Sequence, residues 1–389
     1  MKKKVCFVTG TRAEYGLMYW LMKFMSEDEG IDFQLVVTGM HLSPEFGLTY
    51  KEIEKAGFKI DKKIEMLMSS DTEVGILKSM GLAQIGFAEA FQELQPDVVV
   101  LLGDRFEIFS AASAAMISRI PVAHLHGGEA TEGLIDEPIR HSITKMSHLH
   151  FTATETYRNR VIQMGENPDR VFNVGTPGLD NIYRLELLGK TDFEKSIDFK
   201  LKERNFLITF HPVTLETKTS EKQFLELLEA ISELENTGFI FTKPNSDTDG
   251  RIIIKLIDKF VAKHPEKACA FQSLGQLRYL SALKHVDIVL GNSSSGLAEA
   301  PSFKVATIDI GDRQKGRIKA ESVINCQPEK QSISIALEKA FSKEFQSILK
   351  DVKNPYGEGG ASEKIIEIIK NFDYTDVLKK KFYDINYNN

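Results

Sequence analysis

The sequence predicts an α/β protein made of two Rossmann-like domains that face a central cleft. Three observations support this prediction. Short runs rich in valine and isoleucine alternate with longer helical patterns, the alternation occurs in two halves of similar length, and several runs end abruptly in Gly, Asp, His or Glu. Such alternation is typical of βαβ units around a parallel sheet. Ligands favour domain interfaces and the carboxyl ends of parallel strands.

The first half contains six predicted strands. They cover residues 5–9, 33–37, 98–102, 122–125, 150–154 and 171–174, and helices are expected at 15–25, 72–94 and 109–117. The pattern breaks near Gly175, where Gly-Thr-Pro-Gly-Leu-Asp precedes a charged stretch at 186–204. We therefore expect an N-terminal domain over residues 1–178, with a linker after it.

The same pattern then restarts. Strands are expected at 206–210, 239–242, 268–272, 288–290, 305–310 and 323–325, with helices at 221–234, 249–263 and 276–282. These elements predict a C-terminal domain over residues 179–365. Helical spacing at 362–380 predicts that the terminal segment, 366–389, forms a helix that packs across the domains.

Size and composition narrow the class of protein. A chain of 389 residues suits two domains of roughly 180 residues each. Its net charge of −6 argues against a general nucleic-acid surface. The apolar runs are too short for a membrane span or a signal peptide, and the three separated cysteines fit a reducing compartment. We expect a cytoplasmic protein that binds neither nucleic acid nor membrane.

Ionisable residues gather between residues 101 and 141. This stretch contains Leu-Leu-Gly-Asp-Arg-Phe-Glu, His-Leu-His-Gly-Gly-Glu and Ile-Asp-Glu-Pro-Ile-Arg-His, beginning at the predicted strand ends. Such residues are costly to bury and often serve chemistry. Helix capping alone would account for Asp104 or Asp136 taken singly, but less well for all three segments. The stretch therefore predicts an active site.

A small-residue loop follows the first predicted strand. It reads Thr-Gly-Thr-Arg-Ala-Glu-Tyr-Gly, from Thr9 to Gly16. Small residues let the backbone approach an anion, and Arg12 adds a donor suited to phosphate. The glycine spacing differs from a dinucleotide fingerprint. The loop predicts phosphate or sugar binding, although a tight turn alone would also explain it.

Three motifs in the second half suit a nucleotide diphosphate. Gly291 begins Gly-Asn-Ser-Ser-Ser-Gly-Leu-Ala-Glu, whose hydroxyls and helix start predict a diphosphate cradle. Glu299 is expected two turns into that helix, where it would accept the ribose hydroxyls. A well-capped helix is the alternative.

The other two motifs carry cations or an imidazole. The basic loop Ile-Gly-Asp-Arg-Gln-Lys-Gly-Arg, which begins at Ile310, suits a pyrophosphate but would also suit solvent. His211, in Phe-His-Pro-Val-Thr, follows the first strand of this half and would contact or protonate the leaving phosphate. A lone histidine is more often structural.

A pair of histidines raises the question of a metal. His124 and His126 alternate along a predicted strand, so both imidazoles are expected on one face. The spacing lacks the two-histidine helical arrangement of metalloproteases. We predict no metal.

Taken in order, these motifs resemble the UDP-N-acetylglucosamine 2-epimerase family, and within it the hydrolysing branch that supplies N-acetylmannosamine for sialic acid synthesis. The resemblance runs from the Thr9 loop to Asn354-Pro-Tyr-Gly. It includes Thr-Gly-Met-His, Gly-Asp-Arg-Phe-Glu, His-Gly-Gly-Glu, Ile-Arg-His-Ser-Ile-Thr-Lys, Gly-Asn-Ser-Ser-Ser-Gly and Gly-Asp-Arg-Gln-Lys-Gly-Arg. It implies the GT-B fold, with the nucleotide held mainly by the C-terminal domain.

The resemblance also implies a mechanism without a cofactor. UDP leaves C1 while the C2 proton is removed, and water then adds to the resulting 2-acetamidoglucal with inversion at C2. Like charges in a closed cleft would separate the pKa values of the carboxyl groups into an acid and a base. The predicted catalytic residues are Asp104, His126, Glu129, Asp136, Glu137 and His211. The predicted substrate contacts are Arg12, His41, Arg105, Ser293, Ser294, Ser295, Glu299, Arg313 and Arg317.

One position departs from the pattern. Many relatives place glutamate where this chain has His126, so either this imidazole or Glu129 would perform the task of that carboxylate. The departure also favours a second hypothesis about the sugar, because the branch that acts on N,N'-diacetylbacillosamine nucleotides shares these motifs.

Three other classes of protein stay open at this point. They are a non-hydrolysing epimerase, a GT-B glycosyltransferase and a non-catalytic nucleotide-sugar sensor. The hydrolysing epimerase is favoured because Ile-Asp-Glu-Pro-Ile-Arg-His matches its motif. The resemblance further implies a homodimer or homotetramer.

Overall fold

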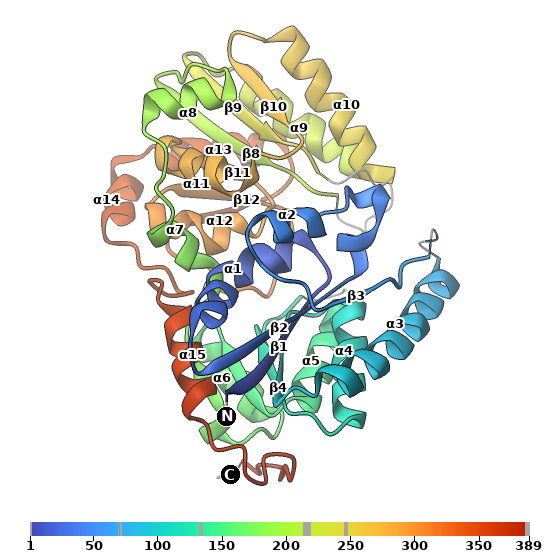
Figure 1. Ribbon diagram of the computed structural model, residues 1–389. Helices are drawn as coiled ribbons and strands as arrows, with labels where there is room; N and C mark the ends of the chain where they lie inside the picture. Colours follow the sequence, from blue (N-terminus) through green and yellow to red (C-terminus); the bar gives the residue numbers. More distant parts are fainter. Residues whose placement is uncertain are drawn as a thin grey trace. The chain divides into compact units, whose positions relative to one another are not determined.

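The computed structural model describes residues 2–68, 70, 72–131, 135–212, 219–244 and 248–385. It divides into two compact units. Unit 1 comprises Met1–Tyr183 together with Tyr356–Asn389, and unit 2 comprises Arg184–Pro355. Each unit is an α/β layer structure around a parallel sheet, which confirms the predicted fold class (Figure 1). The second boundary differs from the expected one, because the chain returns to unit 1 at Tyr356.

The described part of unit 1 contains a seven-stranded parallel sheet with the order β3-β2-β1-β4-β5-β6-β7. Its strands are β1 (Lys3–Thr9), β2 (Ile31–Thr38), β3 (Lys62–Ile64), β4 (Val98–Leu102), β5 (Val122–Leu125), β6 (Leu149–Thr152) and β7 (Val171–Asn173). Six of them overlap the predicted strands. The sequence pattern missed β3, since this strand is short and carries two lysines.

The unit 1 sheet is covered by helices on both faces (Figure 1). Alternate side chains of β1 point to opposite faces. Val5 and Phe7 join a buried cluster that includes side chains of α1 (Arg12–Glu27) and α15 (Ala361–Asn371). Cys6 and Val8 join a second cluster with α3 (Glu73–Leu94), α4 (Phe106–Ile117) and α5 (Asp136–Met146). The remaining helices of this part are α2 (Tyr50–Lys55), α6 (Glu155–Gln163) and α7 (Asp180–Arg184), with short 3-10 turns that include η1 (Gly39–Leu42) and η4 (Pro177–Leu179).

The described part of unit 2 contains a six-stranded parallel sheet with the order β10-β9-β8-β11-β12-β13. Its strands are β8 (Arg204–Thr209), β9 (Thr237–Thr242), β10 (Ala268–Phe271), β11 (Ile288–Gly291), β12 (Ala306–Ile310) and β13 (Val323–Cys326). Its helices are α8 (Lys190–Ile197), α9 (Ser220–Ser232), α10 (Thr248–Lys263), α11 (Gly275–His285), α12 (Ser295–Ala298), α13 (Lys330–Ala340) and α14 (Lys343–Asp351). All six strands overlap the predicted ones, and β8, β9, β11 and β12 are buried along most of their length.

The C-terminal segment differs from the prediction. Its helix, α15, ends at Asn371 instead of continuing to residue 380, and it packs against α1 within unit 1. The carboxylate of Asp180 accepts hydrogen bonds from the backbone N–H groups of Gly360 and Ser362, at 2.6 and 2.9 Å. These bonds satisfy donors at the helix N-terminus, which has no intrahelical partners for them.

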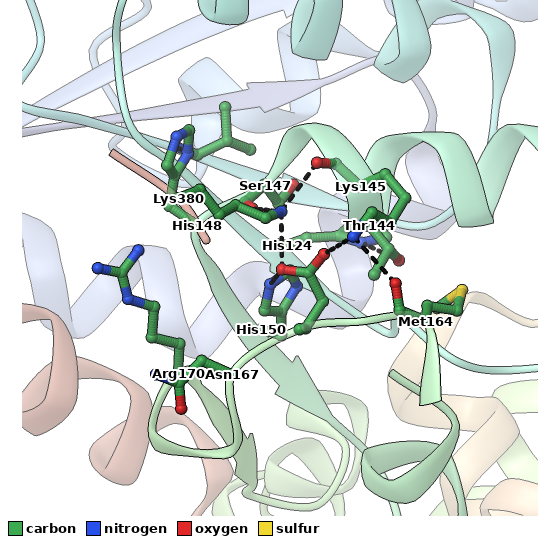
Figure 2. A network of polar contacts seen from close by, with 12 residues as sticks. His124, Thr144, Lys145, Ser147, His148, His150, Met164, Asn167, Arg170 and Lys380 are labelled. Carbon is green, nitrogen blue, oxygen red and sulfur yellow. Dashed lines mark hydrogen bonds and ion pairs between the residues drawn. The ribbon is translucent and has the colours of Figure 1, made fainter. Parts of the chain in front are cut away.

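A buried polar network attaches the last part of the chain to unit 1 (Figure 2). Lys380 lies 2.7 Å from Glu166 and donates to the carbonyl oxygens of Lys145 and Ser147. Glu166 also pairs with Lys145 and with Nε2 of His150. Burial acts to raise the pKa of Glu166, but these donors outweigh it and lower the pKa to about 2. None of the helices in the described part of the chain has the length and apolar character needed to span a bilayer.

Candidate active site

The unit 1 site begins with strand order. β1, β4 and β5 are neighbours and parallel, so their carboxyl ends meet at one edge of the sheet. The loops that leave this edge carry Gly10, Asp104 and His126, respectively. Polar side chains that were distant in the sequence therefore belong to neighbouring loops, as the strand-end argument predicted.

Arg140 organises the first group of carboxylates. This buried residue of α5 forms an ion pair with Asp104, and its Nη1 lies 3.4 Å from Oε2 of Glu137. Glu137 Oε1 also lies 3.1 Å from Nε2 of His141. The structure thus brings together two predicted catalytic carboxylates, which share one guanidinium. Arg140 lies in a predicted motif, but the sequence pattern did not indicate its role.

His126 and Glu129 form a second group. Nδ1 of His126 lies 2.9 Å from Glu129 Oε1, and its Nε2 lies 3.1 Å from the hydroxyl of Thr176. The backbone of His126 is left-handed, with φ of 66°. This uncommon conformation is held by a hydrogen bond from its N–H to the carbonyl of Phe151. Both ring nitrogens are therefore engaged, and the ring is oriented.

The predicted alternation of two imidazoles on one strand is wrong. β5 ends at Leu125, and His126 has already turned out of the strand. His124 is fully buried and bonds Gly103 and Thr144 through its two nitrogens. Burial lowers its pKa to about 3, so it is neutral and structural.

Arg105 connects a third group. Its Nε lies 2.6 Å from Oε1 of Glu107 and 4.0 Å from Oε1 of Glu14. Asp136, the first residue of α5, has a raised pKa because of burial, partly offset by the charge of Arg105 and reinforced by that of Glu107. A carboxyl group with a raised pKa near a cation is suited to accept and return a proton. The sequence analysis did not single out Glu14 or Glu107.

The remaining unit 1 predictions fall on the loop after β1. Arg12 is exposed at the start of α1. His41 is fully buried, and its ring nitrogens pair with Thr9 and Thr49 at 3.2 and 2.7 Å. Burial lowers the pKa of His41 to about 4. His41 is therefore a buried structural residue beside the loop after β1, and both of its ring nitrogens are already paired.

Asn292 is the central residue of the unit 2 group, and sequence analysis missed it. Its side chain accepts from the backbone N–H of His211 at 2.7 Å and donates to the carbonyl of the same residue at 2.8 Å. The carbonyl of Asn292 accepts bonds from Arg313 and Gln314, at 3.0 and 2.9 Å. One buried residue thus holds the His211 segment and the basic loop together. In the sequence, only its position within the Gly-Asn-Ser motif indicated that Asn292 belongs to the site.

Gly291 explains why these loops approach so closely. Its φ is 136°, and a Cβ here would lie 2.0 Å from the carbonyl oxygen of Thr209. Only glycine allows β11 to end against β8 in this way. The neighbouring Asn292 N–H then donates to the same Thr209 carbonyl at 3.1 Å.

The three serines follow this turn. Ser294 is the N-cap of α12, whose four residues end at Ala298, and Ser293, Ser294 and Ser295 are half-buried. The prediction that Glu299 lies two turns into a helix is wrong, because the chain changes to a 3-10 turn, η5 (Ala300–Phe303). Pro301 follows within that turn and prevents continuation of the α-helix.

Glu299 nevertheless lies among polar groups. Burial raises its pKa, while the Ser295 hydroxyl and the charge of Arg317 oppose the shift. Tyr279 of α11 is also close, since burial and the charge of Glu299 raise the pKa of its hydroxyl while the hydroxyls of Ser295 and Ser293 oppose the shift. No sequence signal indicated Tyr279, because a tyrosine within a helix usually belongs to the core.

Arg313 and Arg317 are the cations of this group. Burial and the charge of Arg317 lower the pKa of Arg313, while the charge of Asp309 opposes the shift. Burial and Arg313 lower the pKa of His211 to about 4, so this imidazole is neutral at neutral pH. Two neighbouring arginines with a neutral imidazole favour a bound anion. His211 can donate a hydrogen bond to that anion but does not carry the proton that the sequence analysis considered.

The side chains do not suggest a metal centre. Within the described ranges, no group of three His, Cys, Asp or Glu side chains is arranged to hold a metal ion. The chemistry of the unit 1 residues is that of proton transfer, whereas the unit 2 residues suit a diphosphate.

The two α/β units, each built around a parallel sheet, define a protein of the GT-B fold class. Residues 23–370 match the family model of UDP-N-acetylglucosamine 2-epimerase, and the chain belongs to this family.

Relatives extend over almost the whole chain. A GDP/UDP-N,N'-diacetylbacillosamine 2-epimerase (hydrolyzing) from Campylobacter jejuni is 46% identical over 99% of this chain and 100% of its own length. The polysialic acid biosynthesis protein P7 of Escherichia coli is 42% identical, with 98% of each chain covered. The crystal structure of UDP-GlcNAc 2-epimerase from Neisseria meningitidis bound to UDP-GlcNAc has a TM-score of 0.81 at 20% identity, covering 94% of this chain and 99% of that one. This last similarity establishes the shared fold.

Proposed function

We propose that this protein is a hydrolysing UDP-N-acetylglucosamine 2-epimerase, which converts UDP-GlcNAc and water into N-acetylmannosamine and UDP. The observation that carries the proposal is the group of carboxylates at the strand ends of unit 1, where Asp104 and Glu137 share Arg140. A diphosphate-binding enzyme that only transferred a sugar would not require several carboxylates for a C2 proton.

The first half-reaction breaks two bonds of the sugar. UDP leaves from C1, and a base removes the C2 proton to give 2-acetamidoglucal. Because this proton is weakly acidic, most of the barrier must be lowered by stabilising the departing diphosphate and the positive charge at C1. We assign the diphosphate to Arg313, Arg317 and the serines, with the neutral His211 ring as a hydrogen-bond donor. Glu299 is assigned to the ribose.

Proton transfer is assigned to the unit 1 residues. Asp104 forms an ion pair with Arg140, which suits a group that stabilises positive charge at C1 or removes a proton. Burial raises the pKa of Asp136, which suits a group that takes up a proton and returns it. In the second half-reaction, water adds to C1 and a proton is delivered to C2 on the opposite face, which inverts that centre.

The His126–Glu129 pair is proposed as the second acid/base group. Glu129 Oε1 lies 2.9 Å from His126 Nδ1, while the Thr176 hydroxyl contacts the other nitrogen. An imidazole oriented by a carboxylate can replace a glutamate as a proton carrier. Direct participation of Glu129 as the acid would be the alternative.

A second substrate is favoured by a specific observation. The 46% identical relative carries the name of a GDP/UDP-N,N'-diacetylbacillosamine 2-epimerase (hydrolyzing). UDP- or GDP-N,N'-diacetylbacillosamine is therefore the second candidate substrate. Either product would supply the synthesis of sialic acid or a related nonulosonic acid.

The decisive experiment is incubation of the protein with each nucleotide sugar in deuterated water, followed by proton NMR. Free N-acetylmannosamine carrying deuterium at C2, together with UDP, is the expected result with UDP-GlcNAc. Turnover of the diacetylated nucleotide alone would shift the assignment to the second substrate. Accumulation of UDP-N-acetylmannosamine would indicate a non-hydrolysing epimerase. An absence of turnover with both nucleotides would overturn the proposal.

A further inference from the structure

Two carboxyl groups of unit 1, which the proposed reaction has not used, are buried around one guanidinium. Glu107 is fully buried and Glu14 is 5% exposed. Arg105 Nε lies 2.6 Å from Glu107 Oε1 and 4.0 Å from Glu14 Oε1. Glu14 Oε2 accepts the Gly10 N–H at 2.8 Å. The arrangement therefore places two acids beside one cation.

The fold is shaped to hold this pair. A Cβ at Gly10 would lie 2.5 Å from Glu107 Cγ, so Glu107 occupies the space that any side chain at residue 10 would require. Gly39, with φ of 58°, approaches from η1, where a Cβ would lie 3.5 Å from Glu107 Oε1. Three segments thus enclose the carboxyl group of Glu107.

Charge balance indicates one proton on the pair. Two ionised carboxylates with one arginine would leave a net negative charge in a buried site, which is costly. Glu107 makes the short bond to Arg105 and is the natural anion. In the described structure, Glu14 Oε1 and Glu107 Oε2 are buried without a hydrogen-bond partner, so a second charge would be poorly solvated. Burial and the charge of Glu107 raise the pKa of Glu14 to about 8.

The pair connects to the proposed acid/base chemistry through Arg105. The Arg105 side chain is 37% exposed, so part of its guanidinium can meet a ligand. The charges of Arg105 and Glu107 both act on Asp136 at the start of α5. His41 of η1, whose ring contacts Thr9, also lies near this loop, and burial lowers its pKa to about 4, so it is neutral. A change in the charge of the pair would therefore be felt by both Arg105 and Asp136.

We propose that Glu14 and Glu107 form a carboxyl pair with a single proton, which positions Arg105 and sets the ionisation of Asp136. The inference rests on the proposed function of Asp136 and extends it. Glu14 and Glu107 are positioning residues here, since Arg105 and Asp136 would contact the substrate. Loss of this proton from Glu14 adds a negative charge beside Arg105, which draws the guanidinium toward Glu14 and weakens its effect on Asp136.

Glu14→Gln tests the proton directly. Glutamine resembles the protonated acid in shape but cannot ionise. The wild-type kcat is expected to fall as the pH rises above about 8, where Glu14 loses its proton. In Glu14→Gln this alkaline decline should disappear. An alkaline limb identical to that of the wild type would overturn the proposal, because a purely structural role changes stability and leaves the limb in place.

Glu107→Gln tests whether the Glu107 carboxylate holds Arg105 in place. Removing the anion that holds Arg105 should lower kcat by about 10- to 100-fold, the usual effect of a small misplacement of a reacting group. UDP affinity should stay within about twofold, because unit 2 residues are assigned to the nucleotide. Glu107→Asp keeps the charge and should recover part of kcat. Equal kcat in Glu107→Gln and wild type would contradict the role of the anchor.

An activity-independent measurement separates this inference from the proposed function. The infrared difference spectrum between wild type and Glu14→Gln should contain the band of one protonated carboxyl group at about pH 6. This band, which belongs to the wild type, should be lost at about pH 10. If no nucleotide sugar is turned over, the proposed function fails while this spectrum still tests the proton. If turnover occurs but the carboxyl band is absent, the inference fails alone.

Discussion

Nδ1 of His126 lies 2.9 Å from Oε1 of Glu129, and its Nε2 lies 3.1 Å from the hydroxyl of Thr176. This geometry fixes the plane of the ring and assigns a partner to each nitrogen. The pair therefore offers the clearest test of how this protein moves its second proton.

If His126 carries that proton, His126→Gln should lower kcat by about 100-fold, the usual scale for loss of an acid/base group, and should remove one limb of the pH–rate profile. Glu129→Gln should have a smaller effect of about tenfold, since the ring would lose its orientation but keep its nitrogens. Steady-state kinetics over pH measure both. His124→Gln is the matched control, because His124 is structural and should affect stability while both limbs remain. Retention of both limbs in His126→Gln would assign the proton to another group.

Asp104→Asn should affect both activity and stability. It removes the charge beside Arg140 and should lower kcat by at least about 100-fold. Because Arg140 is buried, the free energy of unfolding should also fall, by about 1–3 kcal/mol, discounted for the partial exposure of Asp104. Calorimetric titration with UDP should show little change. A variant with near-normal kcat would remove Asp104 from the mechanism.

Arg313→Ala should weaken UDP binding by about 1.5–3 kcal/mol, the contribution expected of a charge-assisted contact. Arg313 is held by the Asn292 carbonyl, so its loss should not unfold the loop, which Gln314 also anchors. Lys315→Ala, an exposed cation of the same loop, is the control and should change affinity by less than about 0.5 kcal/mol. Equal affinities in calorimetry for Arg313→Ala and wild type would indicate that the loop is a solvated surface.

Glu166→Gln should destabilise unit 1 by about 3 kcal/mol at neutral pH, because it removes the anion shared by His150, Lys145 and Lys380. The pKa of Glu166 is lowered from 4.5 to about 2 in the folded protein. Its contribution is therefore complete above pH 4.5 and is lost as the pH falls toward about 2. Urea unfolding at several pH values should show the two proteins converging in acid.

The surface pair of Lys62 and Glu93 provides the control for this network. Glu93 is exposed and Lys62 is half-buried, so Glu93→Gln should cost less than about 1 kcal/mol at any pH. A constant difference between Glu166→Gln and wild type down to about pH 2 would show that the carboxylate charge is not the source of stability.

The spacing of apolar residues along the chain was enough to predict most of the strands. Runs such as Val98–Leu102 are so apolar that both faces must be buried, and β4 has these bounds in the structure. The strand β3 was missed because two of its three residues are lysines at the edge of the sheet. The helix at 362–380 was predicted too long, because periodicity continues past Phe372, where the backbone becomes extended.

The sequence by itself determined the fold class and the motifs of the site, since hydrophobic periodicity and glycine-rich turns are local properties. It could not determine which side chain each polar group meets. Three contacts depend on which strands are neighbours: Arg140 pairs with Asp104, Asn292 joins two loops, and both ring nitrogens of His124 are hydrogen-bonded. The departure of His126 from its strand depends on the backbone conformation of that residue. Contacts between residues distant in the chain, and the burial that shifts their pKa values, exist only once the sheet has assembled.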